Sequence, residues 1–443
     1  IRLKLSSALQ ELKLKFNSTD TKFARLEQGK EYLLSSAEDK SAIENALGIS
    51  LPEVGATEAV LDFTSLLPQL MTDKGATVTS TIEVDVRANN RWASEDATVN
   101  RVYTLKCNKP EFSIVTNPGN FWCKEFSVDS CDIKTGDIET ISQKIQYQYR
   151  KKGDEQWIDC DRLVQFDDYP VDKQYQIRAV YREGIETEPV DVVLETPQQL
   201  PNSDMEEWYI EEKKKSGTWP FKDKTYYTFH PYAEGNASSS WWATNNDKAQ
   251  GGTYALGIWY EGCFASCVSY TEDAHGGTKA ALMYLSGCGD GYANTAGTYV
   301  GGAMVGSLFI GTYDSGIIQG HDFDSRPTSM SFWYKYKPYN SDAFKVVVSL
   351  KNGDREIATG TYEPAASSEE DGEYGHATVD FNYTEPFEKA TSICVQFLAS
   401  NKTSLSQSDF DLGTTITYPV IGDWTVHMGS ILKIDDISLA FDK

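Results

Sequence analysis

The stretch Ile431-Leu-Lys-Ile-Asp-Asp-Ile-Ser-Leu439, close to the end of the chain, is a short run of β-branched and apolar residues interrupted by polar ones. Such runs, when bounded by Gly, Asn, Asp or Pro, are typical of β-strands. The sequence before it contains six further runs of this kind: Thr278–Leu285, Ala303–Thr312, Thr328–Tyr336, Phe344–Leu350, Ala377–Tyr383 and Ser392–Leu398. Residues 199–443 are therefore predicted to form one large β domain.

Residues 1–107 are predicted to form a smaller β domain with one short helix. Thr77–Arg87 and Val99–Cys107 alternate as half-buried strands do. Between the strands, Ser36 precedes two acidic residues and is a suitable helix N-cap, while Gly48 is a suitable C-cap. Nothing in this region suggests catalytic chemistry.

Residues 108–198 are predicted to form a second small β domain. Tyr175 opens an alternating strand, and Trp157 follows a charged hairpin turn. These features resemble a fibronectin type III domain, a fold in which such a Tyr marks a corner of the sandwich and such a Trp packs in the core. The segment after it, Thr196–Pro201, has the composition of a linker.

The composition narrows the choice of partners. The chain has 443 residues, and 65 acidic residues against 41 basic residues give a formal net charge of −24. A field of that sign repels phosphate backbones, so nucleic acid is not expected as a partner. No window reaches the roughly 20 apolar residues that a membrane-spanning helix needs. The eight Cys residues contain no C-x-x-C pair, so the common zinc frameworks are not expected.

The two ends of the large domain indicate its fold more specifically than the composition does. It opens with Pro201-Asn-Ser-Asp-Met-Glu-Glu-Trp208 and closes with Gly429–Leu439. This pairing resembles the frame of galactose-binding-like jelly rolls, a fold shared by many carbohydrate-binding modules. The resemblance implies that the first and last strands lie close together. Glu206 and Asp435 would then be candidate ligands for Ca²⁺, which prefers several oxygen ligands. The alternative is that these carboxylates cap loops or face solvent.

Three further stretches extend the resemblance over about 240 residues. They are Ser240-Trp-Trp-Ala-Thr-Asn-Asn246, Met304–Tyr313 and Arg326–Pro338. Together with the closing strand, they resemble the carbohydrate metabolism domain found in surface proteins of Gram-negative gut bacteria. The resemblance implies an all-β protein in which two immunoglobulin-like or fibronectin III-like β-sandwich domains precede a larger jelly-roll β-sandwich. It also implies export to the outer cell surface, with a lipid anchor, or secretion.

Aromatic residues beside polar ones mark the candidate glycan site. Sugar rings pack their C–H faces on flat aromatic side chains, while their hydroxyl groups need polar partners. Trp241 and Trp242, followed by Asn245, supply both in one segment. Neighbouring residues of a strand point to opposite faces, so one of the two Trp residues is expected in the core. Trp219, Trp259 and Tyr260 have comparable sequence surroundings and are further candidates for glycan binding.

Catalysis finds little support in the sequence. A glycosidase needs two carboxylates beside one bond, whereas Glu206-Glu207 and Asp435-Asp436 are neighbours on strands and are expected to point to opposite faces. The preferred interpretation is non-catalytic binding of a polysaccharide or glycoconjugate. The alternatives are a structural or adhesive protein that binds a host or cell-surface protein, and a glycan-active enzyme.

Overall fold

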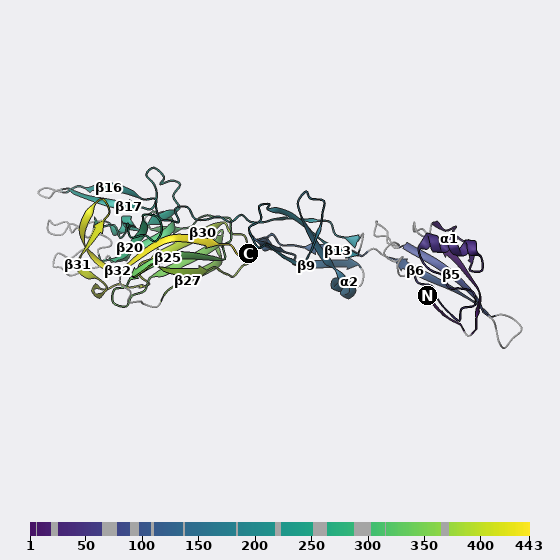
Figure 1. Cartoon of the computed structure of the whole chain (residues 1–443). Coiled ribbons are helices and arrows are strands. Elements are labelled where there is room, and N and C mark those ends of the chain that lie inside the picture. The colour runs from purple at the N-terminus through teal and green to yellow at the C-terminus, as the bar shows by residue number, and fades with distance from the viewer. Residues whose placement is uncertain are drawn as a thin grey trace. The chain divides into compact units, whose positions relative to one another are not determined.

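The structure of the chain, a computed structural model, consists of two compact units (Figure 1). Unit 1 contains residues 1–116, 127–164 and 174–192, and unit 2 contains residues 117–126, 165–173 and 193–443. The predicted boundaries after residues 107 and 198 stay predictions. The structure describes all residues except 6, 19–24, 64–77, 89–96, 108–109, 136–137, 183–184, 218–222, 251–263, 288–302, 315 and 365–371.

The first part of unit 1 is built on an antiparallel sheet with the strand order β3-β2-β5-β6, accompanied by the two-stranded ribbon β1-β4. Its elements are β1 (Arg2–Lys4), β2 (Leu9–Asn17), β3 (Glu31–Leu33), α1 (Ala37–Leu47), β4 (Glu58–Val60), β5 (Val78–Ala88) and β6 (Ala97–Cys107). Alternate residues of β2 and β5 are buried and pack against α1. Together these side chains form a hydrophobic core that is separate from the core of unit 2.

Helix α1 has the two predicted caps. The side chain of Ser36 accepts a hydrogen bond from the backbone N–H of Asp39, which satisfies one of the free N–H groups at the start of the helix. Gly48 ends the helix in the left-handed conformation, with φ of 62°. Ile43 and Leu47 are the buried residues that attach the helix to the sheet.

The second part of unit 1 contains further antiparallel strands. Its elements are β7 (Glu111–Val115), β9 (Ser130–Thr135), α2 (Ile138–Lys144), β10 (Gln146–Lys151), β11 (Ile158–Cys160), β13 (Gln174–Arg182), β14 (Ile185–Glu186) and β15 (Val190–Val193). Two short strands, β8 (Glu125–Ser127) and β12 (Leu163–Gln165), have residues assigned to each unit. Tyr175 is buried. Trp157 is only half-buried, because its ring lies between the guanidinium groups of Arg150 and Arg178, at 4.4 and 4.1 Å. The expected core position of Trp157 was therefore wrong.

Unit 2 is a β-sandwich of two antiparallel sheets with a separate ribbon, β16-β17. One sheet has the order β18-β22-β30-β26-β27-β29, with β23 and β24 attached, and the other has the order β19-β20-β32-β25-β28, with β21 and β31 attached. The strands are β16 (Tyr209–Lys215), β17 (Lys224–His230), β18 (Trp242–Thr244), β19 (Val268–Thr271), β20 (Ala280–Ser286), β21 (Met304–Val305), β22 (Ser307–Tyr313), β23 (Ile317–Gln319), β24 (His321–Asp322), β25 (Ser329–Lys337), β26 (Lys345–Asn352), β27 (Arg355–Tyr362), β28 (Gly375–Asp380), β29 (Asn382–Tyr383), β30 (Ser392–Leu398), β31 (Asp411–Tyr418) and β32 (Gly422–Ala440). A short helix, α3 (Asn246–Ala249), follows β18.

The core of unit 2 lies between these two sheets. Phe397 and Val348 of one sheet belong to the same buried cluster as Phe332 and Ile434 of the other. Alternating side chains of both inner faces fill such a sandwich. The predicted all-β fold is confirmed.

Unit 2 contains a buried charge cluster. Arg326 is 1% exposed, and its Nε donates a hydrogen bond to Oε1 of Glu195 at 2.8 Å. Lys389 contacts the same carboxylate oxygen at 2.6 Å. The guanidinium of Arg326 stacks on the ring of Trp122, 3.7 Å from its centre. One carboxylate thus neutralises two cations.

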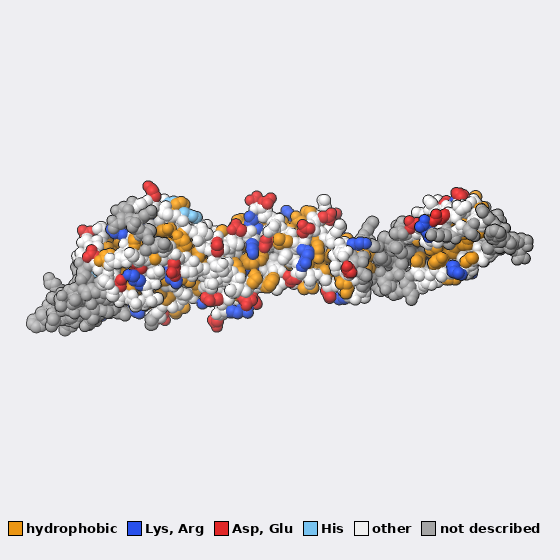
Figure 2. Space-filling model, turned by 90° about the horizontal axis from the view of Figure 1, so that it is seen from below, with side chains coloured by type: hydrophobic (Ala, Val, Ile, Leu, Met, Phe, Trp, Pro, Cys, Tyr) orange, Lys and Arg blue, Asp and Glu red, His pale blue; other side chains and the backbone are white. Residues whose placement is uncertain are grey.

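The surface charge is mixed. In Figure 2, acidic and basic side chains are interspersed over the face shown, with no continuous basic area. Within the described ranges, no helix is long and apolar enough to cross a membrane.

Candidate functional site

A pocket of about 200 Å³ lies on unit 2 where β17, β18 and β22 meet. Its lining comes from the end of β17 and the segment that follows it, from β18 and α3, and from the end of β22: Thr228, His230, Pro231, Tyr232, Ala237, Ser240, Trp242, Ala243, Thr244, Asp247, Gly311, Thr312 and Tyr313. Aromatic rings and polar groups therefore share one concave surface, as they do in sites for small polar ligands.

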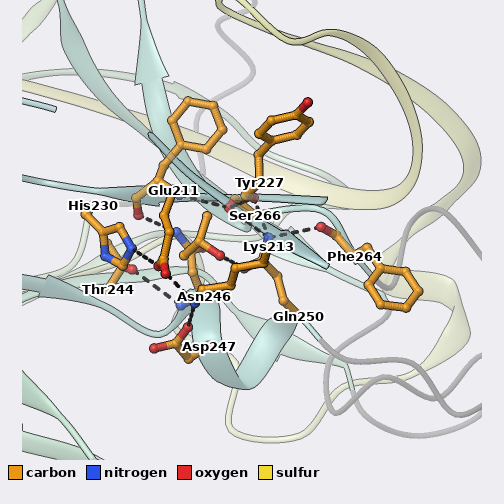
Figure 3. A network of polar contacts seen from close by, with 12 residues as sticks. Glu211, Lys213, Tyr227, His230, Thr244, Asn246, Asp247, Gln250, Phe264 and Ser266 are labelled. Atoms are coloured by element: carbon orange, nitrogen blue, oxygen red, sulfur yellow. Dashed lines mark hydrogen bonds and ion pairs between the residues drawn. The ribbon is translucent and has the colours of Figure 1, made fainter. Parts of the chain in front are cut away.

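Buried amide side chains fix the position of α3 (Figure 3), which contributes Asp247 to the lining of the pocket. Asn246 is fully buried; its Nδ2 donates to the carbonyl groups of Phe229 and Val268, and its Oδ1 accepts from the N–H of Val268. Gln250 donates to the carbonyl groups of Tyr227 and Phe264 at 2.6 and 3.0 Å. A fully satisfied buried network of this kind makes the local structure rigid.

The rigid helix places the carboxylate of Asp247 beside charged residues of β16. Nζ of Lys213 lies 2.7 Å from Oδ1 of Asp247 and 3.3 Å from Oε2 of Glu211. Burial by itself lowers the pKa of Lys213, but the two carboxylates outweigh it and hold the pKa above its ordinary value. Lys213 therefore stays charged and links the ribbon to α3.

Glu211 also contacts the histidine of the pocket. Nε2 of His230 lies 3.0 Å from Oε2 of Glu211. Burial alone raises the pKa of Glu211, yet the hydrogen bond with His230 and the charge of Lys213 outweigh it, so the pKa lies below its ordinary value. A general acid needs the opposite shift, because it must keep its proton near neutral pH. The environment of Glu211 is therefore not that of a general acid.

Stacked rings continue from His230 along one side of the pocket. The imidazole stacks on Tyr232 at 5.2 Å between ring centroids and on Tyr209 at 5.9 Å. Burial raises the pKa of the Tyr232 hydroxyl, and the nearby charges of Glu211 and Asp247 add to this. Tyr232 therefore stays protonated. Its side chain is only partly buried, so that both its hydroxyl group and the face of its ring can contact a ligand.

The structure separates the two predicted tryptophans. Trp242 is 1% exposed, donates its Nε1 hydrogen to the carbonyl of Pro201 at 2.8 Å, and packs beside Phe397. Trp241 is partly exposed and stacks on His321 at 4.0 Å. The expectation that one of the pair is in the core is confirmed. Trp242 is not available as an open platform, although its edge lines the pocket.

The predicted polar residue Asn245 is an internal anchor. It is 5% exposed; its Nδ2 donates to the carbonyl of Val305, and its Oδ1 accepts from the N–H of Ser307. Its neighbour Asp247 faces the pocket instead. Three other predicted residues, Trp219, Trp259 and Tyr260, lie outside the described residues.

Four residues were not predicted: His230 and Tyr232, which line the pocket, and Glu211 and Lys213, which contact His230 and Asp247 of its lining. Glu211 and Lys213 lie on β16, almost 30 residues before the predicted segment, whereas His230 ends β17 and Tyr232 follows it, both within ten residues of Ser240. The only local signal was an aromatic-rich strand with a histidine at its end. Pairing between β18 and β22 and the attachment of α3 to β17 bring the two segments together.

The predicted metal ligands both contact the loop between β19 and β20. The carboxylate of Glu206 accepts hydrogen bonds from the backbone N–H groups of Thr278 and Lys279 at 2.6 and 2.8 Å, and from the Thr278 hydroxyl at 2.6 Å. The fully buried Asp435 accepts from the N–H groups of His275 at 2.7 Å and Gly276 at 3.1 Å. The ends of the domain do meet, as the resemblance implied.

Asp436 also reaches this loop, through a carboxylate contact with Nδ1 of His275 at 2.6 Å. The expectation that Asp435 and Asp436 point to opposite faces was therefore wrong. The reason is a β-bulge: Asp436 has φ of 45°, and the pairing of β25 with β32 shifts between Ser331 and Trp333. A bulge residue leaves the regular alternation.

Two glycines allow the loop to come this close. A Cβ on Gly276 would lie 2.5 Å from Oδ2 of Asp436, and a Cβ on Gly277 would lie 2.2 Å from Oε1 of Glu206. Gly277 also has φ of +60°, a conformation that disfavours other residues. The Gly-Gly pair thus lets backbone N–H groups approach the carboxylates directly.

These contacts do not fit a calcium ion held by Glu206 and Asp435. The backbone N–H donors point at the oxygens that a cation would need, and they supply the positive partial charge in its place. In the described parts of the chain, no group of three or more His, Cys, Asp or Glu residues could hold a metal ion. Both carboxylates instead hold the loop between β19 and β20 in place by accepting hydrogen bonds from its backbone N–H groups.

Chelation tests this assignment. We expect excess EDTA to leave the midpoint of thermal unfolding unchanged, because N–H donors and not a cation neutralise Glu206 and Asp435. Differential scanning calorimetry with EDTA, with added Ca²⁺ and with neither would measure it. A midpoint that falls by several degrees in EDTA and recovers with Ca²⁺ would contradict the assignment.

Comparison with known proteins gives distant matches in structure only. No family model matches the sequence, and no curated protein matches it. A solved structure of carbohydrate-binding modules from the β-sandwich superfamily is 8% identical, with a TM-score of 0.22; the match covers 75% of this chain and 98% of the other. A module in complex with β-1,4-galactotriose is 12% identical (TM-score 0.21; 46% and 92% covered). An arabinose-bound α-L-arabinofuranosidase is 10% identical (TM-score 0.22; 39% and 21% covered).

Proposed function

We propose that unit 2 binds carbohydrate, without cleaving it, in the pocket formed by β17, β18 and β22. The observation that carries the proposal is the meeting of Tyr232 and Tyr313 with His230 and Asp247 on one concave surface. The rings supply flat apolar faces for sugar C–H groups, and the polar side chains supply hydrogen-bond partners for hydroxyl groups. The anchored helix α3 holds this arrangement in advance of binding, which reduces the entropy lost on association.

The charges of the site support binding rather than hydrolysis. The carboxylates of Glu211 and Asp247 are both engaged by Lys213, and the pKa of Glu211 is lowered, after the opposing effect of burial, by His230 and Lys213. A glycosidase would need one carboxyl group with a raised pKa beside the scissile bond. The proposed role is therefore recognition.

Titration of the full chain with a panel of soluble oligosaccharides tests the proposal. We expect saturable binding to one class of glycan, measured by isothermal titration calorimetry. Replacing Tyr232 by alanine or Asp247 by alanine is expected to weaken that binding at least about tenfold, which corresponds to about 1.4 kcal/mol. Both side chains are partly or fully exposed, so the fold should survive the changes.

Matched controls are available elsewhere on unit 2. Tyr169 is 46% exposed and Asp380 is exposed on β28, and neither lines the pocket. Tyr169→Ala and Asp380→Ala should bind as the unaltered chain does. Equal loss in the control and pocket variants, or a glycan cleaved during the titration, would argue against the proposal.

The proposal implies a location where glycans are met, and export to the outer cell surface, by a lipid anchor or by secretion, is part of it. This part is supported by the resemblance of the sequence to bacterial surface proteins. Labelling of intact cells with a membrane-impermeant reagent would test it. A protein that is labelled only after lysis would contradict it.

A further inference from the structure

The outer strand of the first sheet in unit 1 has the features of an open pairing edge. β6 spans 11 residues and pairs with β5 over 11 consecutive residue pairs without a register shift. Among the described residues, no strand pairs with its other side. The opposite edge, β3, has only three residues. A long, regular edge is a template for another strand, and proteins commonly blunt such edges with bulges, Pro or charged residues.

The side chains of β6 leave this edge unprotected. Its sequence, Ala-Thr-Val-Asn-Arg-Val-Tyr-Thr-Leu-Lys-Cys, has no Pro and only two charged residues, Arg101 and Lys106. Val99 is 47% exposed and Val102 is 58% exposed. Exposed valines on a bulge-free edge strand favour an interface rather than a solvated surface.

The faces of β6 follow from its register. Val99 and Tyr103 are paired with Val86 and Ile82, both buried in the core. Directly paired residues share a face of the sheet, so Val99 and Tyr103 lie on the core face, although neither side chain is fully buried. Val102 lies on the opposite face. Both faces of the edge therefore carry an exposed valine.

We infer that β6 pairs with β6 of a second copy of this chain, antiparallel and centred on Val102. A two-fold axis perpendicular to the sheet would place the two core faces on the same side. In this register Val99 lies opposite Leu105, which packs in part against the core, and Arg101 lies opposite Tyr103. The first pair extends the apolar face across the axis, and the second is a cation–π pair.

The neighbouring registers are worse for physical reasons. A pairing centred on Arg101 places the two guanidinium groups opposite each other, and like charges at that position are destabilising. A pairing centred on Tyr103 places Arg101 opposite the apolar Leu105 and leaves Val102 opposite Thr104. Only the register centred on Val102 joins apolar to apolar and cation to ring along the middle of the strand.

Sedimentation velocity of the full chain over a concentration series tests the pairing. We expect the mass to rise from 49.4 kDa toward twice that value as the concentration increases. Val102→Lys is expected to keep the chain monomeric, because it places two ammonium groups together at the axis, and its circular dichroism should show the fold intact. Val171→Lys is the matched control, since Val171 is 96% exposed and lies far from β6 in sequence, and it should associate normally.

A cysteine at the axis tests the register itself. In Val102→Cys the two new thiols would face each other across one strand pair, at a separation that a disulfide can bridge. Mild oxidation is expected to give a covalent dimer of Val102→Cys but not of Thr98→Cys, with the unaltered chain as the background control. A chain that stays monomeric at every concentration, or equal cross-linking of both variants, would overturn the inference.

Discussion

Replacing Glu195 by glutamine is expected to lower the free energy of unfolding of unit 2 by about 3–5 kcal/mol. Glu195 is 7% exposed, and its carboxylate is the shared partner of Arg326 and Lys389. Arg326 has no exposed side-chain surface and cannot lose its proton in a protein. Removal of the negative charge would therefore leave a permanent buried cation against the ring of Trp122 without its ionic partner.

The two cations of the cluster should respond unequally. Burial lowers the pKa of Lys389, and Glu195 opposes this effect; the Lys389 side chain is 38% exposed. Lys389→Met should therefore cost much less than Glu195→Gln. Urea unfolding followed by tryptophan fluorescence would compare the two variants. Similar, small losses in both would show that the cluster contributes little to stability.

Replacing Trp242 by alanine is expected to cost about 3–5 kcal/mol of stability, because it opens a large cavity in the core of unit 2. Trp242 is 1% exposed, packs beside Phe397, and donates a hydrogen bond to the carbonyl of Pro201. The neighbouring Trp241 is partly exposed on its stack with His321. Trp241→Ala should therefore cost less than Trp242→Ala.

The pair of variants also separates stability from binding. Trp242→Phe keeps most of the volume and should stay folded, while it alters one edge of the pocket. Thermal unfolding and glycan titration of Trp241→Ala, Trp242→Ala and Trp242→Phe would be measured side by side. If Trp241→Ala were the more destabilised of the two alanine variants, the assignment of Trp242 to the core would be wrong.

Strands with one buried face were predictable from the sequence, and strands with other patterns were not. Ser392–Leu398 was predicted with the same bounds that the structure has. β32 begins at Gly422, whereas the predicted strand began at Ile431. Its first part was missed because five consecutive residues, Val426–Ser430, are buried and their sequence shows no alternation. β16 was missed because Glu211–Lys215 is a run of charged residues, which is typical of a solvated turn.

The candidate site was predictable only in part, because residue types reveal one segment of it but not how its side chains are oriented. The segment Ser240–Asp247 was chosen for its aromatic and amide residues, and it does line the pocket. Its amides are turned inward, since Asn245 and Asn246 satisfy backbone groups of neighbouring strands. Residue types alone cannot distinguish an amide that binds a ligand from one that anchors a loop. The buried side-chain contacts between α3 and β17, which place His230 and Tyr232 beside the segment, are not visible in a local pattern.

The bulge at Asp436 also sets the spacing of apolar residues in the last strand. Before it, the core side chains are the even-numbered Leu432 and Ile434; after it, they are the odd-numbered Ile437 and Leu439. The extra residue thus changes which parity faces inward. Loss of Asp436 alone would remove the extra residue and restore regular alternation, with Ile437 and Leu439 still facing inward. Insertion of one further residue here would instead turn these side chains toward solvent. Sequences that keep this bulge should therefore keep two residues between the two inner isoleucines, Ile434 and Ile437, whatever side chains fill the bulge.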